Sequence, residues 1–308
     1  MRWCYQTKGV ALITVMLILA LATILAVAVT ARQRVDIHRS ANIFNFEQDY
    51  QYVVGAESWA KQILKRDFVN NKTDSLRDDW ALEIPPLPIE GGQMKGTLED
   101  LQARFNINNL VQNGKPQTLE IERFKHLLRI LELDENLVAA IVDWIDPDEE
   151  TGFSGAEDNE YLNLTPAYRA ANRSMEDVSE LLLIKGFNNE NYEKLRPYVC
   201  VLKSVTAINV NTAPAEILAS LTKDLSLENA QTLVEERNKN IYEKLEDFLK
   251  EPVLNGSKIK ADGLSVSSQY FVLDSTVQIE NNKVTYMTTL RRENEGNTLT
   301  LKRSRGVL

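Results

Sequence analysis

Residues 8–32 read KGVALITVMLILALATILAVAVTAR. Within this stretch the twenty-two residues 10–31 carry no charge, and as a helix they reach about 33 Å, enough to cross a bilayer core of about 30 Å. The apolar region of a secretory signal usually has only about 7–15 residues, so this run is too long for a plain cleaved signal. Basic Arg2 and Lys8 precede the run, which by the positive-inside rule puts the N-terminus in the cytoplasm. We therefore predict a membrane span at 10–31, with the rest of the chain in the periplasm of a Gram-negative cell.

The short basic leader ends in Gly9, and the apolar helix follows it directly. This arrangement resembles the precursors of type IV pilins. In that family a prepilin peptidase cuts after the glycine on the cytoplasmic side of the membrane, and the apolar helix stays as anchor and assembly stem. The resemblance implies cleavage between Gly9 and Val10, with 1–9 as the leader peptide. The alternative is an ordinary signal anchor that is not cleaved.

Thr14 departs from the pilin pattern, because most pilin-like proteins carry Glu at this fifth mature position. A carboxylate in hydrocarbon is costly unless it is paired. In the family it pairs with the free N-terminal amine of the neighbouring subunit already in the fibre. A subunit with no neighbour above it would leave that Glu unpaired. Thr14 therefore suits a subunit that stands first, at the tip of a fibre.

Length and charge limit the remaining possibilities. A chain of 308 residues has a prior of about two domains. The net charge of -9 becomes more negative if the basic leader is removed, and such a chain repels phosphate backbones, so we expect no nucleic acid partner. The two cysteines are Cys4 and Cys200, and removal of the leader takes the first, which excludes a disulfide framework. We expect Cys200, in an apolar run, to be a small buried hydrophobic residue.

The sequence predicts a long stem helix and an antiparallel sheet. Residues 32–64 contain no Pro and a single Gly, and their apolar residues recur at three- and four-residue steps, which extends the helix well beyond the membrane. Strand-like alternation marks 93–98 weakly and the C-terminal region strongly, in three runs separated by turn residues. These three C-terminal runs are 270–279, 283–292 and 297–302.

The middle of the chain is helix-patterned and repeats itself. The matched segments come in three pairs whose spacing shows that the first copy holds some 27 residues more than the second. Small helical repeats with Asn-x-Asn turns resemble helix-hairpin-helix or SAM-like modules, some of which bind DNA, but the negative charge favours packing or protein contacts. The pairs are FNINNL (105–110) with INVNTA (208–213), LDENL (133–137) with LENA (227–230), and SELLL (179–183) with LEDFL (245–249).

The extra residues of the first copy are strongly acidic. Five carboxylates lie within 143–150 and three more within 157–160. They repel one another unless water or a cation separates them, and oxygen ligands without nearby His or Cys favour calcium. The spacing is not that of an EF-hand, so a solvated acidic loop remains the alternative. Pro147 and Gly152 bend the chain, which favours convergence of the carboxylates.

Several of these motifs together resemble the K-type minor pseudopilins of bacterial type II secretion, over nearly the whole chain. The resemblance implies an α+β fold, in which a pilin-like N-terminal helix packs on an antiparallel sheet and a large helical domain is inserted. It divides the chain into a span at 10–31, stem and start of the head at 32–100, an inserted helical domain at 101–256 and closing strands at 257–308. The motifs are GV (9–10) with Thr14, DWIDPD (143–148), GAED (155–158), YRAAN (168–172), SELL (179–182) and NVNTA (209–213).

The same resemblance implies a structural calcium ion in the helical domain. Carried over by position, its ligands are Asp146, Asp148, Glu157 and Asp158. Further ligands, through side-chain or backbone oxygen, are Asp143, Glu150 and Tyr161.

The function implied is that of an assembly protein and not an enzyme. It would nucleate and cap a periplasmic pseudopilus, anchored in the inner membrane, with I-, J- and H-type minor pseudopilins, the major pseudopilin and prepilin peptidase as partners. One alternative is a minor pilin of a type IV pilus or DNA-uptake system. Another is a membrane-anchored periplasmic enzyme, but the two histidines, His38 and His126, have no Ser or Cys constellation near them in sequence.

Overall fold

The computed structural model describes residues 8–83, 85–279 and 282–306. The chain divides into two compact units between Val54 and Gly55. Helix α1, Lys8–Asn70, supplies all of the described part of the first unit and continues into the second. Residues 1–7 of the expected leader lie outside the described residues, whereas Gly9 and Val10 belong to the first turns of α1.

The first unit carries the expected span. In the described chain, α1 is the one helix long and apolar enough to cross a membrane, with a window of mean hydropathy 2.9 whose residues are all exposed. Its three threonine hydroxyls each donate to a backbone carbonyl one turn back, at 2.9 Å for Thr14, 2.7 Å for Thr23 and 2.8 Å for Thr30. No threonine hydroxyl of this segment therefore needs a partner from outside the helix.

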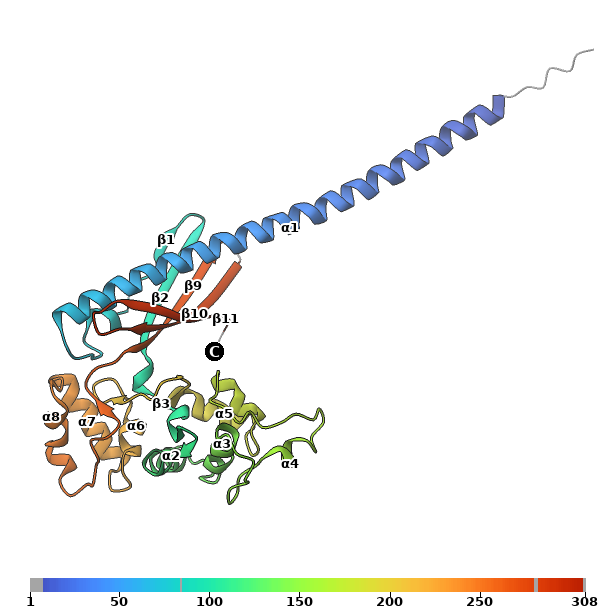
Figure 1. Ribbon diagram of the computed structural model, residues 1–308. Coiled ribbons are helices and arrows are strands. Elements are labelled where there is room, and N and C mark those ends of the chain that lie inside the picture. The colour runs from blue at the N-terminus through green and yellow to red at the C-terminus, as the bar shows by residue number, and fades with distance from the viewer. Residues whose placement is uncertain (1–7, 84, 280–281, 307–308) are drawn as a thin grey trace, which may run out of the picture. The chain divides into compact units, whose positions relative to one another are not determined.

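The second unit is built on a five-stranded antiparallel sheet of order β1-β2-β9-β10-β11 (Figure 1). The strands match the alternating runs of the sequence, with β1 added inside the proline-rich connector, and a bulge lies between Thr289 and Leu290 where β10 pairs with β11. The strands are β1 Leu87–Ile89, β2 Gly92–Asp100, β9 Tyr270–Ile279, β10 Asn282–Arg292 and β11 Thr298–Arg305.

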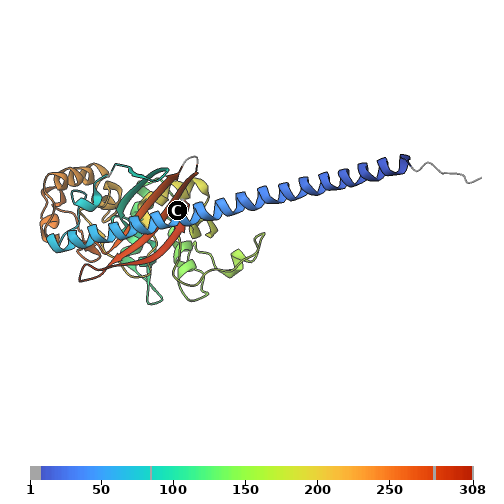
Figure 2. The same cartoon turned by 90° about the horizontal axis from the view of Figure 1, so that it is seen from above.

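The last turns of α1 pack on one face of this sheet, as Figures 1 and 2 show. Ala60 and Leu64 of α1 are fully buried and meet Phe271 and Leu290 of the sheet in one apolar cluster. Arg292 fixes the same junction through ion pairs to two carboxylates. The expected α+β arrangement, a stem helix packed on an antiparallel sheet, is confirmed.

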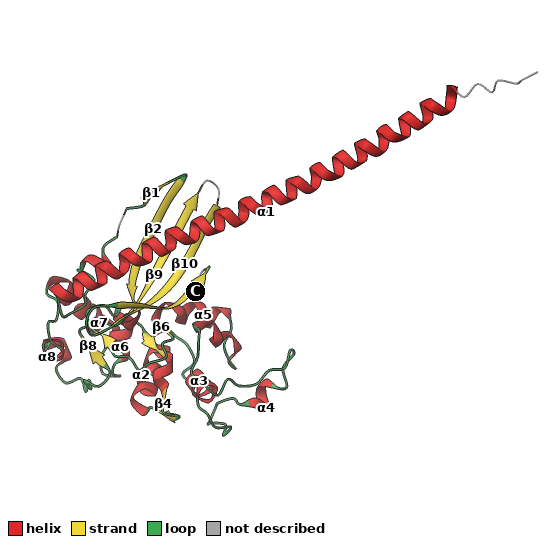
Figure 3. Ribbon diagram, turned by 45° about the horizontal axis from the view of Figure 1, so that its top comes forward, coloured by secondary structure: helices red, strands yellow, loops and turns green. Residues whose placement is uncertain are grey.

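The helical segment lies between β2 and β9 in sequence and on the other side of the sheet from α1 (Figure 3). Its apolar core is separate from that of the sheet. The helices are α2 Thr118–Ile130, α3 Leu137–Ile145, α4 Asp158–Tyr161, α5 Asn189–Leu195, α6 Ala215–Ser220, α7 Leu227–Lys239 and α8 Leu245–Leu249. The 3-10 turns are Asp79–Ala81, Leu101–Ala103, Ile107–Leu110, Val178–Leu183, Arg196–Tyr198 and Pro252–Leu254.

Short strand pairs join the ends of this segment. Two of the pairs are parallel: β3 (Phe105–Asn106) with β6 (Val199–Cys200), and β7 (Ile208–Asn209) with β8 (Leu264–Ser265). The antiparallel pair is β4 (Val111–Gln112) with β5 (Lys115–Pro116). Since β8 pairs with β7, the segment includes residues beyond the boundary expected at 256.

The two Asn-x-Asn motifs make the same backbone contact, which we call the asparagine clamp. Asn108 donates to the carbonyl of Met175 at 3.0 Å and accepts from its amide at 2.9 Å. Asn211 does the same with Tyr242, at 2.9 Å and 3.0 Å. All four bonds are buried, so each clamp satisfies a donor and an acceptor that water cannot reach.

Candidate metal centre

The acidic residues that follow α3 converge. Asp146, Asp148 and Glu157 each offer a carboxylate oxygen, and these atoms lie within 4.8 Å of one another. Asp146 comes directly after α3, and Glu157 directly before α4. The loop between the two helices therefore returns to its starting point and closes three carboxylates around one position.

Two of these carboxylates are buried without hydrogen bonds. Asp146 is 5% and Glu157 2% exposed, and Oδ1 of Asp146 and both carboxylate oxygens of Glu157 lack a partner. A buried polar atom without a partner costs free energy, and neighbouring like charges raise that cost. A bound cation would remove both penalties at once.

The pKa values show the same conflict. Burial first, then the neighbouring carboxylates Asp143, Asp146 and Asp148, raises the pKa of Glu157 to about 7. Burial, with Asp148 and Asp143, raises the pKa of Asp146 to about 6. Burial and mutual repulsion thus favour the protonated form of these carboxyl groups. A bound divalent cation would favour the ionised carboxylates, which are the form that coordinates a metal.

Asn172 is a candidate ligand that sequence reasoning did not single out. Its Oδ1 is buried without a partner, while its Nδ2 donates to the carbonyl of Asp148 at 3.0 Å. The backbone of Asn172 has a φ of 45°, a left-handed conformation that Asn tolerates better than most residues. Only the position of Asn172 at the end of the YRAAN motif could have drawn attention to it.

Asp143 shapes the loop. It is buried, its Oδ2 accepts from the amide of Gly152 at 3.0 Å, and burial raises its pKa. A Cβ added to Gly155 would lie 1.8 Å from the same oxygen. Asp143 is therefore in contact with the loop backbone and does not belong to the group of three carboxylates that converge.

The other expected ligands surround the three carboxylates. The carboxylate of Asp158 accepts from the amide of Ala170 at 2.9 Å and pairs with Arg169 at 3.1 Å, so both of its oxygens are engaged. Glu150 is exposed, and its amide donates to Asp148 Oδ1 at 2.9 Å.

Tyr161 belongs to the apolar support of the loop. Its ring centroid lies 5.2 Å from that of Trp144 and 5.4 Å from that of Tyr168. Its hydroxyl accepts from the amide of Lys185 at 3.4 Å, and burial raises its pKa to about 12. Tyr161 therefore packs the loop onto α3, and its side chain lies among aromatic rings.

A second acidic group already has a cation of its own. Asp67, Asp74 and Asp78 converge in the same way, but Arg292 lies 2.5 Å from Asp74 and 3.3 Å from Asp67. The guanidinium occupies the position that a metal ion would need. Among the described residues, the group beside α3 is therefore the stronger candidate for metal binding.

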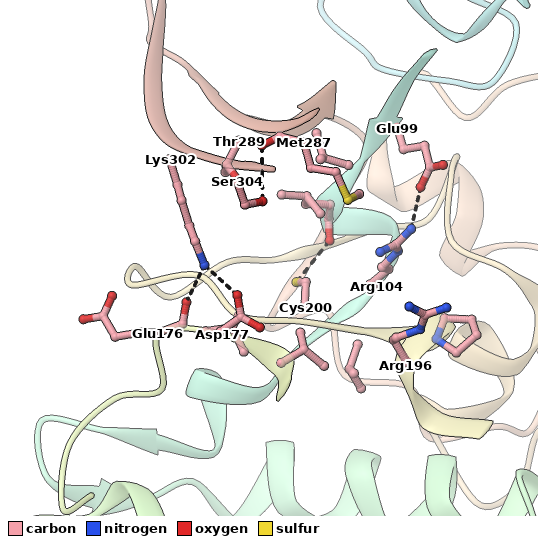
Figure 4. Close-up of a pocket in the computed structure, with 16 residues that line it drawn as sticks. Glu99, Arg104, Glu176, Asp177, Arg196, Cys200, Met287, Thr289, Lys302 and Ser304 are labelled. Carbon is pink, nitrogen blue, oxygen red and sulfur yellow. Dashed lines mark hydrogen bonds and ion pairs between the residues drawn. The ribbon is translucent and has the colours of Figure 1, made fainter. Parts of the chain in front are cut away.

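A hollow of about 320 Å³ lies between the sheet and the helical segment, and Figure 4 shows the side chains that line it. Four of its charged side chains pair with each other, Lys302 with Asp177 at 2.6 Å and Arg104 with Glu99 at 2.5 Å. Cys200 is buried, as expected from its sequence context, and its thiol donates to the carbonyl of Leu101 at 3.3 Å. Burial raises the pKa of this thiol to about 12, which makes it a poor nucleophile.

Comparison with known proteins identifies the family. Two family models, both described as type II secretion system (T2SS), protein K, match residues 103–204 and 208–267. Type II secretion system protein K of Pseudomonas aeruginosa is 34% identical over 97% of this chain and 93% of its own length. The protein K of Klebsiella pneumoniae is 32% identical, over 94% of each chain.

The fold agrees with these matches. A chain in the crystal structure of the GspK-GspI-GspJ complex from enterotoxigenic Escherichia coli aligns with a TM-score of 0.79 and 28% identity, over 88% of this chain and all of that one. The chain belongs to the type II secretion system protein K family, a family of minor pseudopilins that are structural components of a protein transport system and not enzymes.

Proposed function

We propose that the chain nucleates and caps the tip of the type II secretion pseudopilus, and that export of folded periplasmic proteins across the outer membrane requires it there. The observation that carries the proposal is Thr14, at the position where pilin-like proteins carry Glu. Its hydroxyl donates to the carbonyl of Ala11 at 2.9 Å, so it needs no neighbouring subunit above it. A tip subunit has no such neighbour.

We infer its partners from the family. The similar solved structure is a complex with GspI and GspJ, which supports I- and J-type minor pseudopilins as neighbours of this chain. An H-type minor pseudopilin and the major pseudopilin would follow below them. Prepilin peptidase would cut between Gly9 and Val10, and residues 10–31 would hold the chain in the inner membrane with its N-terminus cytoplasmic and its head periplasmic.

Two substitutions test the tip assignment. Gly9→Val should leave an unprocessed precursor and abolish secretion, as a gel-mobility and secretion assay in whole cells would measure. Thr14→Glu should be processed normally yet lower secretion, because its carboxylate has no amine to meet at the tip. Thr14→Ser is the matched control and should secrete normally. Normal secretion with Thr14→Glu would contradict the tip assignment.

We also propose that a calcium ion binds beside α3 and has a structural role. The supporting observation is the set of buried oxygens without partners on Asp146, Glu157 and Asn172, joined by the carboxylate of Asp148. Calcium accepts six to eight such oxygens in a flexible arrangement. When bound, it would neutralise the negative charge of the three carboxylates and would hold both ends of the loop together.

Calorimetric titration of the purified full-length chain with calcium tests this proposal. The wild-type protein should bind calcium, and Glu157→Gln should lose most of the affinity. Glu149→Gln changes an exposed carboxylate in the same loop and should bind like the wild type. Equal binding by Glu157→Gln and wild type would rule out this site.

A further inference from the structure

The most exposed large apolar side chain of the described residues is Phe153, at 97%. It is the second residue of the four-residue turn 152–155, in which the amide of Gly155 donates to the carbonyl of Gly152 at 2.9 Å. The next residue, Ser154, has a φ of 68°, as the third position of a type II turn requires. The turn holds the ring of Phe153 out in the solvent.

Neither Phe153 nor Ser154 contributes to the stability of the fold through its own conformation or burial. A fully exposed Phe forgoes the roughly 1.5–3 kcal/mol that burying such a side chain contributes. A left-handed backbone at a residue other than Gly costs roughly 1–2 kcal/mol. Such local costs persist where the surrounding structure enforces them, and they are most often found at functional positions.

The surrounding structure does enforce this turn. Asp143, on the buried face of α3, accepts from the amide of Gly152 at 3.0 Å. Cβ atoms added to Gly152 and Gly155 would lie 2.9 Å and 1.8 Å from its carboxylate oxygens. The backbone on both sides of Phe153 is thus held against Asp143 of α3, so the backbone of the turn need not be ordered when a partner binds the ring. Pre-organised aromatic side chains of this kind dominate binding energy at protein interfaces.

The negative charge around the turn indicates what kind of partner surface would be complementary to it. Glu149 and Glu150 precede the turn, both are exposed, and neither forms an ion pair within the part of the chain that the structure describes. The chain as a whole carries -9. An anionic lipid surface would repel this region, whereas a protein surface with Lys or Arg around an apolar pocket would complement it.

We propose that Phe153 is the anchor of a docking site for a protein partner, whose surface offers an apolar pocket rimmed by Lys or Arg. The ring enters the pocket, and Glu149 and Glu150 meet the basic rim. The site uses a different part of the chain from Thr14 and does not involve the three converging carboxylates Asp146, Asp148 and Glu157. It therefore adds a contact that the tip assignment does not contain.

Photo-crosslinking in secreting cells tests the docking site directly. The full chain carries benzoylphenylalanine in place of Phe153 and is irradiated with and without the Glu149→Lys/Glu150→Lys pair. We expect a discrete protein adduct whose yield falls at least about tenfold on charge reversal, since a basic rim would then repel the turn. An adduct to lipid alone, no adduct, or an adduct indifferent to the charge reversal would overturn the proposal.

Secretion assays of variants at the same turn provide a second test of the docking site. Phe153→Ala should reduce secretion at least about fivefold without changing the melting temperature, because the ring makes no contacts in the fold. Phe153→Tyr, which keeps the ring, and Ser154→Gly, which keeps the turn, should secrete normally. Full secretion by Phe153→Ala would overturn the docking site, whereas normal secretion by cells lacking the whole chain would instead overturn the tip assignment.

Discussion

The two halves of the helical segment, 103–204 and 208–267, share a scaffold and differ in what is added to it. Both use the asparagine clamp after a two-residue parallel strand. In the second half only residues 240 and 241 separate α7 from the clamped Tyr242, whereas in the first half residues 146–174, which include α4, separate the matched helix α3 from the clamped Met175. The scaffold therefore needs no acidic loop, and the candidate metal centre belongs entirely to the insertion.

The halves also differ in how their first asparagine is anchored. Asn106 donates to the backbone carbonyls of Leu202 and Ser204, which are neutral. Asn209 instead donates to the carboxylate of Asp100 at 3.2 Å. The first asparagine of the first half is thus bonded to neutral groups of its own half, whereas that of the second half is bonded to the last residue of β2, a group that can titrate.

The largest expected effect is loss of the clamps, which would show whether the halves are equivalent. Asn108→Ala and Asn211→Ala should each lower the free energy of unfolding by about 4 kcal/mol, since each leaves a buried amide and carbonyl without partners. Urea denaturation of the full-length chain would measure both. Exposed Asn255→Ala should change the stability by less than about 0.5 kcal/mol. A large loss of stability from one substitution and none from the other would mean that the two clamps have the same geometry but contribute unequally to stability.

Asp100 should make the junction between the second half and the sheet depend on pH. Burial raises its pKa from 3.8 to about 6, against hydrogen bonds from Ser268 and Thr212 that lower it. The protonated form is thus favoured in the folded state, and stability falls as the pH rises from about 4 to about 6, by roughly 3 kcal/mol at most. Asp100→Asn should make this slope shallower, which denaturation at several pH values would reveal, while the part due to Asp146 and Glu157 should persist. Exposed Asp262→Asn should keep it, and an unchanged slope in Asp100→Asn would assign the dependence to another group.

Calcium should protect one half and not the other. At a hundredfold excess over Kd, binding stabilises the bound region by about 2.7 kcal/mol, which corresponds to roughly 100-fold slower amide exchange. Hydrogen exchange of the full-length chain should show this protection at 146–174 and little change at 227–249. Glu157→Gln should abolish it. Equal protection of both halves would mean that the ion acts on the whole segment and not on the insertion alone.

How much of the fold could be predicted from the sequence depends on how far apart in the chain the contacting residues lie. The stem and the long strands were predictable, because 32–64 contains no Pro and 270–279 alternates. The two-residue strands β3 and β7 were not, since two residues have no periodicity. Their pairing also joins residues far apart in the chain, which local patterns do not encode.

The candidate site divides in the same way. Asp146, Asp148 and Glu157 were predicted from the resemblance, and the structure brings them together, although their role as metal ligands stays a prediction. Asp158 was predicted with them, but its carboxylate is held by Arg169 and by an amide twelve residues away. Asn172 was missed, because it reaches the loop from 24 residues away.

The smallest expected difference lies at the N-termini of the matched helices α3 and α7. Ser226 caps α7 by accepting from the amide of Asn229 at 3.2 Å, whereas Asn136 makes no side-chain bond at the start of α3. Ser226→Ala should therefore cost about 1 kcal/mol and Asn136→Ala close to nothing, as denaturation would measure. In the first half the turn before α3 is held instead by Asp134, whose Oδ1 accepts from the amide of Asn136 at 2.9 Å. Equal costs at the two positions would contradict this difference.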